Sequence, residues 1–187
     1  MARNLALHAV ALGFGLTCAG HALAADVYKG TAKFKDATGQ PATASVTISI
    51  DEPTPESERT ALVAAAKADP KAAKKMLAEH KPIGYIEARD VRVPIKYAYV
   101  YPAGDGELIN VISDEPLGFI GGDKKSAKSK EGFDLTYASL QMNTAGRGRG
   151  ELAPACKVKW MPSGAPAVDD YGKQVVWLDD VTKSSQP

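Results

Sequence analysis

Aromatic side chains on several predicted strands are the residues of this sequence best suited to contacting a ligand. Three tyrosines alternate along the run 97–101, so a β-strand would place all three rings on one face. A buried tyrosine hydroxyl needs a hydrogen-bond partner, while the ring offers a broad apolar surface. The pattern therefore predicts either a core stripe or a ligand-binding face, such as a lined cavity. The candidate ligand-binding residues are Tyr97, Tyr99, Tyr101, Tyr137, Trp160 and Trp177.

Positive charge gathers in two segments that could attract an anionic group or partner. One is the lysine-rich stretch 123–130, and the other is Gly146-Arg147-Gly148-Arg149-Gly150. The alternative to binding is a solvated loop for the stretch 123–130 and a plain hairpin turn for the glycine-rich segment. The glycine-rich segment lacks the Lys-Ser/Thr pair of a phosphate loop, and no aromatic residues alternate with the lysines as in nucleic-acid surfaces. The candidate anion-binding or partner-binding residues are Lys124, Lys125, Lys128, Lys130, Arg147 and Arg149.

The remaining inventory offers little for catalysis or metal binding. Of the three histidines and two cysteines, only His80 and Cys156 lie beyond residue 21, which is too few for a typical zinc site. A Gly-x-Ser-x-Gly nucleophile elbow is absent, and acidic pairs such as Asp179-Asp180 lack the spacing of a calcium loop. We therefore expect no metal, no cofactor and no catalytic residue. A hydrolase that uses carboxylates and tyrosines is the alternative.

Residues 1–24 have the pattern of a secretory signal peptide. Arg3 supplies the positive start, an apolar run follows, and Ala22-Leu23-Ala24 is a small-x-small cleavage pattern. Removing these 24 of the 187 residues leaves 163, and losing Arg3 leaves 22 basic and 22 acidic residues. A formally neutral chain lacks the positive field of most nucleic-acid-binding proteins. We expect a periplasmic or secreted protein, a monomer with at most peripheral membrane contact and no nucleic-acid partner.

The elements that position these side chains are mostly strands. From Tyr28 to Phe34, and again from Ala44 to Ile50, apolar and polar residues alternate with the period of a half-buried strand. The run 91–101 alternates similarly, so Val93, Ile95 and Tyr97 are expected on one face, with Pro94 marking an edge or a bulge.

The strands expected after residue 132 alternate less regularly than the earlier ones. A slip in the alternation near Ala138 predicts a bulge there, and Pro154 marks another edge or bulge. The Pro-, Gly- and Asp-rich stretch 161–172 is expected to be a loop.

Two helices are expected in the alanine-, lysine- and glutamate-rich stretch 54–81. Thr54 is the expected N-cap of the first, followed by Pro55, and Asp69-Pro70 repeats this start for the second, which ends at His80. Their narrow apolar stripes predict a helical hairpin that lies on a sheet. Together these elements predict a mainly β (α+β) fold, an antiparallel barrel-like sheet of about nine strands with the hairpin inserted after the second strand. Residues 25–182 would form one domain and residues 183–187 a flexible tail; barrel and sandwich remain alternatives.

Several segments of the chain resemble a group of exported bacterial β-rich proteins with no established activity. The resemblance rests on Lys81-Pro82-Ile83-Gly84-Tyr85, on Ser113-Asp114-Glu115-Pro116-Leu117-Gly118-Phe119 and on Phe133-Asp134-Leu135-Thr136. It implies one exported β-rich domain and implies no cofactor or catalytic residue.

The sequence thus favours an exported, non-enzymatic binding or accessory protein. Its ligand would be a small apolar or amphipathic molecule held by the sheet, or an envelope protein docked on the aromatic face. A hydrolytic enzyme and a structural envelope protein are the two alternatives.

Overall fold

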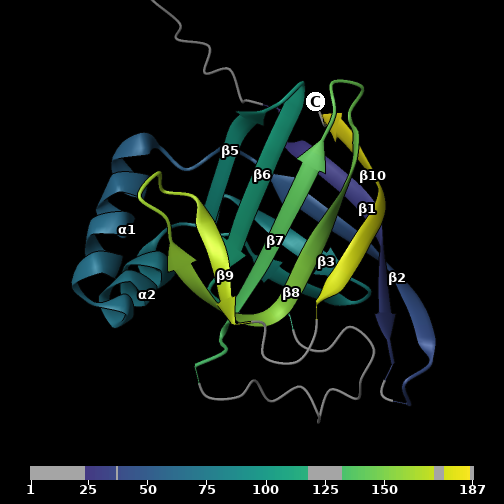
Figure 1. Ribbon diagram of the computed structural model, residues 1–187, viewed down its shortest axis with the longest axis horizontal. Coiled ribbons are helices and arrows are strands. Elements are labelled where there is room, and N and C mark those ends of the chain that lie inside the picture. The colour runs from purple at the N-terminus through teal and green to yellow at the C-terminus, as the bar shows by residue number, and fades with distance from the viewer. Residues whose placement is uncertain (1–23, 37, 118–131, 171–174, 186–187) are drawn as a thin grey trace, which may run out of the picture.

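The computed structural model describes residues 24–36, 38–117, 132–170 and 175–185, and the expected signal peptide lies outside them except for Ala24. Ten strands and two helices form within these residues (Figure 1). In chain order they are β1 (Asp26–Lys35), β2 (Pro41–Ile50), α1 (Glu56–Ala68), α2 (Pro70–Glu79), β3 (Gly84–Ala88), β4 (Val91–Pro94), β5 (Tyr97–Ala103), β6 (Gly106–Ser113), β7 (Leu135–Met142), β8 (Arg147–Trp160), β9 (Pro166–Asp170) and β10 (Val176–Ser185).

One curled antiparallel sheet carries the fold. Nine strands pair in the order β4-β3-β2-β1-β10-β8-β7-β6-β5, and β9 pairs with the end of β8. The sheet forms a half-barrel, and the helical pair lies between β2 and β3 in the chain. The fold class expected from the alternation of strands and the position of the two helices is therefore confirmed.

The two end strands of the sheet, β4 and β5, are joined by only two residues. Ile95 donates its N–H to the Gly84 carbonyl at 2.9 Å, whereas Lys96 donates to the Ile112 carbonyl at 2.9 Å. One bent stretch of chain therefore contacts both ends of the sheet. The expectation that Val93, Ile95 and Tyr97 share a face is wrong, because Val93 and Ile95 pack in one core cluster and Tyr97, beyond the bend, in another.

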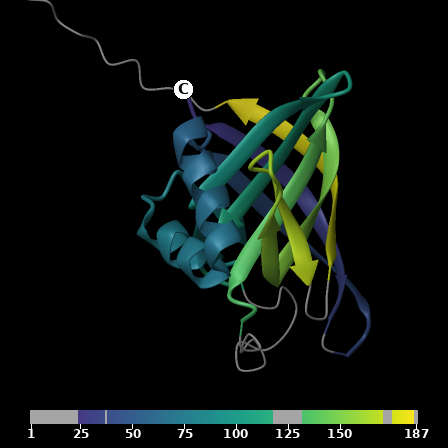
Figure 2. The same ribbon diagram turned by 60° about the vertical axis from the view of Figure 1, so that its left-hand side comes forward.

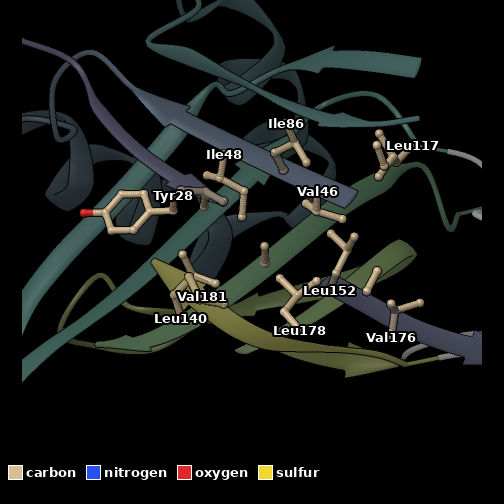
Figure 3. Packing of buried hydrophobic residues seen from close by; sticks show 14 of the residues in the cluster. Tyr28, Val46, Ile48, Ile86, Leu117, Leu140, Leu152, Val176, Leu178 and Val181 are labelled. Atoms are coloured by element: carbon tan, nitrogen blue, oxygen red, sulfur yellow. The ribbon is translucent and has the colours of Figure 1, made fainter. Parts of the chain in front are cut away.

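The inside of the curled sheet is filled by a cluster of buried side chains, here called the interior cluster (Figure 3). It contains Tyr28, Ala32, Phe34, Ala44, Val46, Ile48, Ile50, Ile86, Ala88, Val93, Ile95, Ala98, Ile109, Val111, Leu117, Ala138, Leu140, Met142, Leu152, Val176, Leu178 and Val181. The alternation expected for the first two strands is confirmed, because Tyr28, Ala32 and Phe34 of β1 all point inward. The side of the sheet opposite this cluster is called the outer face.

The repeated glycines of β8 allow its backbone to lie close to that of β7. A Cβ atom on Gly148 would collide with the carbonyl oxygen of Gln141, and one on Gly150 with that of Ser139. Glycine in a strand commonly marks such a close backbone approach. The spacing that resembled an anion-binding loop is thus required for the packing of β8 against β7.

The helices cover part of the outer face beside β5 and β9 (Figures 1 and 2). Leu62 of α1 and Leu77 of α2 are buried there in a second cluster, together with Tyr97, Ile112, Tyr137, Ala153 and Cys156. No helix among the described residues is both long and apolar enough to cross a membrane.

The starts of the two helices differ from each other. Asp69 caps α2 as expected, because its carboxylate accepts the N–H of Lys71 at 2.9 Å. Thr54 does not cap α1: its side chain is buried and its hydroxyl accepts the N–H of Ala98 in β5 at 2.9 Å. The N-cap expectation for Thr54 is therefore wrong.

Three local features depart from the sequence pattern. The bulge expected near Ala138 is not in β7, whereas the bulge expected at Pro154 is present, because β8 has one extra residue between Ala153 and Cys156. The expected loop 161–172 contains β9. The strand β10 continues to Ser185, which pairs with Asp26, so Lys183 and the two residues after it extend the sheet.

Candidate ligand-binding site

Three of the six candidate aromatic residues pack beneath the helices and β9. The Tyr97 and Trp160 rings meet edge to face, with centroids 4.7 Å apart and an interplanar angle of 79°. Tyr97 donates its hydroxyl to the Gly164 carbonyl, and Tyr137 donates to Asn110 Oδ1 at 2.8 Å. Burial raises the pKa of Tyr97. These satisfied hydroxyls give Tyr97 and Tyr137 a packing role.

Two further candidates form a stacked pair on the outer face of β5. The rings of Tyr99 and Tyr101 lie 4.8 Å apart at 28°, and both residues are half-buried. The Arg59 guanidinium of α1 lies 4.9 Å from the centroid of the Tyr99 ring, a cation–π distance. The pair therefore links the helical cover to the open part of the outer face.

Trp177 is the aromatic candidate whose ring is open to solvent. It is 60% exposed, whereas its neighbours in β10, Val176 and Leu178, are each 1% exposed and point into the interior cluster. Strand alternation therefore directs Trp177 to the outer face. Because most of its surface is exposed, its packing contributes little to stability.

An open groove of about 590 Å³ lies beside Trp177 on the outer face, and we call it the Trp177 groove. Its lining comes from β1, β6, β7, β8 and β10, which are neighbours in the sheet and are all labelled in Figure 1. The lining residues are Lys33, Leu108, Ser139, Gln141, Arg149, Gly150, Glu151, Trp177 and Asp179.

Strand register brings these residues together. Trp177 is opposite Lys33 on β1 and Glu151 on β8, and Glu151 is opposite Ser139 on β7. Directly paired residues of antiparallel strands point to the same side of the sheet. The side chains of Lys33, Ser139, Glu151 and Trp177 therefore form one row across the groove.

A second row runs parallel to the first. Leu108 of β6 is opposite Gln141 of β7, and Gln141 is opposite Arg149 of β8. Asp179 lies at the β10 end of the groove, just before Asp180, whose φ of 53° falls in the left-handed region. The register of β10 shifts between Leu178 and Val181, so both of these residues point inward and Asp179 lines the groove.

The charges of the groove are partly paired. Lys33 Nζ lies 2.6 Å from Asp179 Oδ2, and this hydrogen bond raises the pKa of the exposed Lys33 amine. The side chain of Arg149 is exposed, and the structure gives this side chain no hydrogen bond or ion pair with another described residue. A guanidinium can donate two parallel hydrogen bonds to a carboxylate. Arg149 is thus placed to bind an anionic group beside the Trp177 ring.

The other candidate cations are separate from this groove or outside the described residues. Arg147 is exposed at the start of β8 but is not part of the groove lining. The four candidate lysines, Lys124, Lys125, Lys128 and Lys130, lie outside the described residues.

A polar cluster lies where β1, β6 and β10 meet. Lys183 Nζ is 3.0 Å from Asp26 Oδ2 and 3.0 Å from Glu107 Oε1, and 5.5 Å from the Tyr28 ring centroid. Burial lowers the pKa of Lys183, but its hydrogen bonds to the two carboxylates outweigh this and raise the pKa overall. Burial also raises the pKa of Tyr28. The cluster ties the C-terminal strand to β1 and β6.

Cys156 and His80, the residue types suited to nucleophilic or metal chemistry, lie in positions where they support the fold. Cys156 is fully buried, and burial raises the pKa of its thiol to about 12. His80 ends α2, with Nδ1 3.6 Å from Glu58 Oε2. Within the described part of the chain, no three His, Cys, Asp or Glu residues are grouped so as to hold a metal ion.

The polar lining residues Ser139, Gln141 and Glu151 are missed when the sequence is read one strand at a time. Each follows an inward-facing residue in the alternation, which marks only an exposed strand position. Their convergence depends on strand order, because β8 pairs with β10, which is separated from it along the chain by β9. A tryptophan at an outward strand position was the available signal.

Comparisons of the chain with protein-family models, curated proteins and solved structures found no match. The function must therefore be inferred from the residues of the chain itself.

Proposed function

We propose that this chain is an exported, non-enzymatic binding protein whose ligand lies in the Trp177 groove. The observation that carries the proposal is the 60% exposure of Trp177 beside Arg149 and a row of polar side chains. An indole ring offers a large apolar surface that a partner can cover, and its N–H can donate a hydrogen bond to the same partner. Tryptophan and arginine are also the residues most enriched at binding hot spots.

The packing inside the sheet supports an outer site over an inner one. Aliphatic side chains from both halves of the curled sheet fill the interior (Figure 3). Residues such as Ile48, Ile86 and Leu152 are at most 1% exposed. A small apolar ligand inside would have to displace these contacts. The proposal therefore places the ligand on the outer face of the sheet and not in its interior.

Export is the part of the proposal that rests on the sequence. The first strand begins at Asp26, two residues after the expected cleavage site at Ala24, so cleavage there would leave β1 whole. In the envelope or the medium the Trp177 groove would meet small molecules and envelope surfaces. The mass of the chain recovered from the periplasm or medium checks this part, because an N-terminus at Ala25 is expected.

The binding proposal is tested by comparing the exported protein with the Trp177→Ala variant in native mass spectrometry. Both are mixed with a panel of envelope-derived sugars, lipids and peptides. The unmodified protein is expected to show a bound mass that the variant loses. The matched control is Met161→Ala, because Met161 is the other exposed large hydrophobic residue in the described ranges, at 44% exposure.

Two results would count against the proposal. The first is that no panel member binds the unmodified protein. The second is that a bound mass survives Trp177→Ala and is lost in Met161→Ala, which would place the site at the end of β8.

A further inference from the structure

The outer face continues from the Trp177 groove to the stacked tyrosines of β5. Tyr101 is opposite Leu108 and Tyr99 is opposite Asn110, so each tyrosine extends one of the two rows that cross the groove. From β5 to β10 the rows cross four strand-to-strand steps of about 4.8 Å each, roughly 19 Å in all. The row of Trp177 ends at Tyr99 and passes Asn110, which is 2% exposed, whereas the row of Arg149 ends at Tyr101. An elongated ligand with one end on Trp177 therefore reaches Tyr101 by crossing to the row of Arg149.

The side chains along these rows have the chemistry that sugars require. The face of an indole ring provides a flat apolar surface for the C–H face of a sugar ring, which is amphipathic. Ser139, Gln141 and Glu151 provide donors and acceptors for ring hydroxyls. A purely apolar ligand would leave these polar groups without their hydration, which costs free energy.

One cation of the lining, Arg149, is available to a singly charged acidic sugar. Lys33 and Arg149 balance Glu151 and Asp179, so the lining has no net charge. Lys33 is paired with Asp179, and Arg149 remains to bind an anion. A monoanionic carboxylate matches one guanidinium bidentately and is neutralised by it. A phosphate dianion would carry a second negative charge that Arg149 alone does not balance, in a lining that also holds Glu151 and Asp179.

We propose that the Trp177 groove binds a linear acidic glycan, with one sugar ring on Trp177 and its carboxylate on Arg149. This inference rests on the proposed function and names the ligand class of the same site. Adjacent rings of the glycan lie along the rows toward Tyr101.

The test compares acidic oligosaccharides with their methyl esters, which keep the sugar ring and lose the charge. The probes are oligomers of galacturonate, mannuronate and glucuronate, each in both forms. The mature protein is labelled with 5-fluorotryptophan, which gives one ¹⁹F signal for Trp177 and one for Trp160, the two tryptophans of the chain. At least one acidic oligomer is expected to shift the Trp177 signal and to bind at least about tenfold more tightly than its ester.

Variants of Arg149 and Arg147 test whether the carboxylate of the glycan contacts Arg149. Arg149→Gln is expected to weaken binding of the acidic oligomer by about tenfold or more and to abolish its advantage over the ester. Arg147→Gln, two residues away on β8 and outside the groove lining, is the matched control and is expected to leave affinity nearly unchanged.

The possible failures separate this inference from the proposed function. If esters bind as tightly as acids, or if Arg149→Gln has no effect, the acidic-glycan inference is overturned. If only a lipid or a peptide shifts the Trp177 signal, the inference also fails while the proposed binding site stands. If no compound of any class perturbs Trp177, both fail.

Discussion

The buried hydroxyl of Thr54 provides a prediction that separates the structure from the sequence pattern. The Thr54 side chain is 1% exposed, and its Oγ1 accepts the N–H of Ala98 at 2.9 Å. The Thr54 backbone N–H also donates to the Ala98 carbonyl at 2.9 Å. These two bonds satisfy the N–H and the carbonyl of Ala98, which lie on the edge of β5 that does not pair with β6. Thr54→Val keeps the shape of the side chain and removes the acceptor.

The expected loss of stability follows from the group that is left without a partner. In the valine variant the Ala98 N–H remains buried, and an unsatisfied buried donor costs about 1–3 kcal/mol. Thr54→Ser keeps the oxygen and is expected to retain more of the stability than valine does. Urea unfolding of the three proteins measures the differences, and Thr43→Val, an exposed threonine of β2, is the control with an expected change of less than about 0.5 kcal/mol.

Amide hydrogen exchange decides which element depends on the hydroxyl. The structure predicts faster exchange of the Ala98 amide in Thr54→Val, with little change in the first turn of α1. An N-cap role predicts the reverse, since capping satisfies the N–H groups of the first helical turn. Unchanged exchange at Ala98, or a stability loss below about 0.5 kcal/mol, would refute the reasoning.

Three further predictions concern other parts of the molecule. Trp177→Ala is expected to change the free energy of unfolding by less than about 0.5 kcal/mol, as measured in urea, because its ring is 60% exposed; a loss like that of a core residue would contradict the exposed placement. Lys183→Met is expected to cost about 1.5–3 kcal/mol, because it leaves Asp26 and Glu107 without their shared cation; Asp26→Asn combined with Glu107→Gln should restore part of the loss. The Cys156 thiol is expected to resist iodoacetamide at pH 8 unless the protein unfolds, and alkylation of the folded protein at the rate of a free thiol would contradict its burial. The pKa of the Cys156 thiol is about 12 in the folded protein and about 8.5 in the unfolded chain. The neutral thiol therefore contributes its full stabilisation below about pH 8.5, and this stabilisation is lost as the pH rises toward 12. A Cys156→Ala variant should lack this loss of stability when unfolding is measured as a function of pH.

The fold could be predicted from the sequence where patterns are local. The alternation from Tyr28 to Phe34 gave the inward face of β1, and Asp69-Pro70 gave the start of α2. Thr54 was misassigned because a threonine before Pro55 fits a helix start, while its actual partner, Ala98, is 44 residues away. The alternation predicts Tyr97 on the face of Ile95 because it runs unbroken from one to the other, and Pro94 indicates an edge or a bulge without showing that the face changes.

The candidate site could be predicted only in part. Trp177 and Arg149 were identified by residue type, but the sequence pattern grouped Trp177 with Tyr97, which is buried beneath the helices. The groove depends on the order of β1, β10, β8, β7 and β6 in the sheet, which pairs strands distant in the chain. Residue spacing within each strand defines its face, and strand order determines which faces are neighbours.

The central claim, that ligand binds on the outer face at Trp177, is tested most directly by a map of backbone amide shifts. The ¹⁵N-labelled mature protein is titrated with the tightest-binding acidic oligomer, and the shifts are plotted on the sheet. We predict that the largest changes occur at groove residues such as Gln141, Glu151 and Trp177, while interior residues such as Ile48 and Ile86 change little. Shifts concentrated on the interior cluster, or on β3 and β4, would contradict the account.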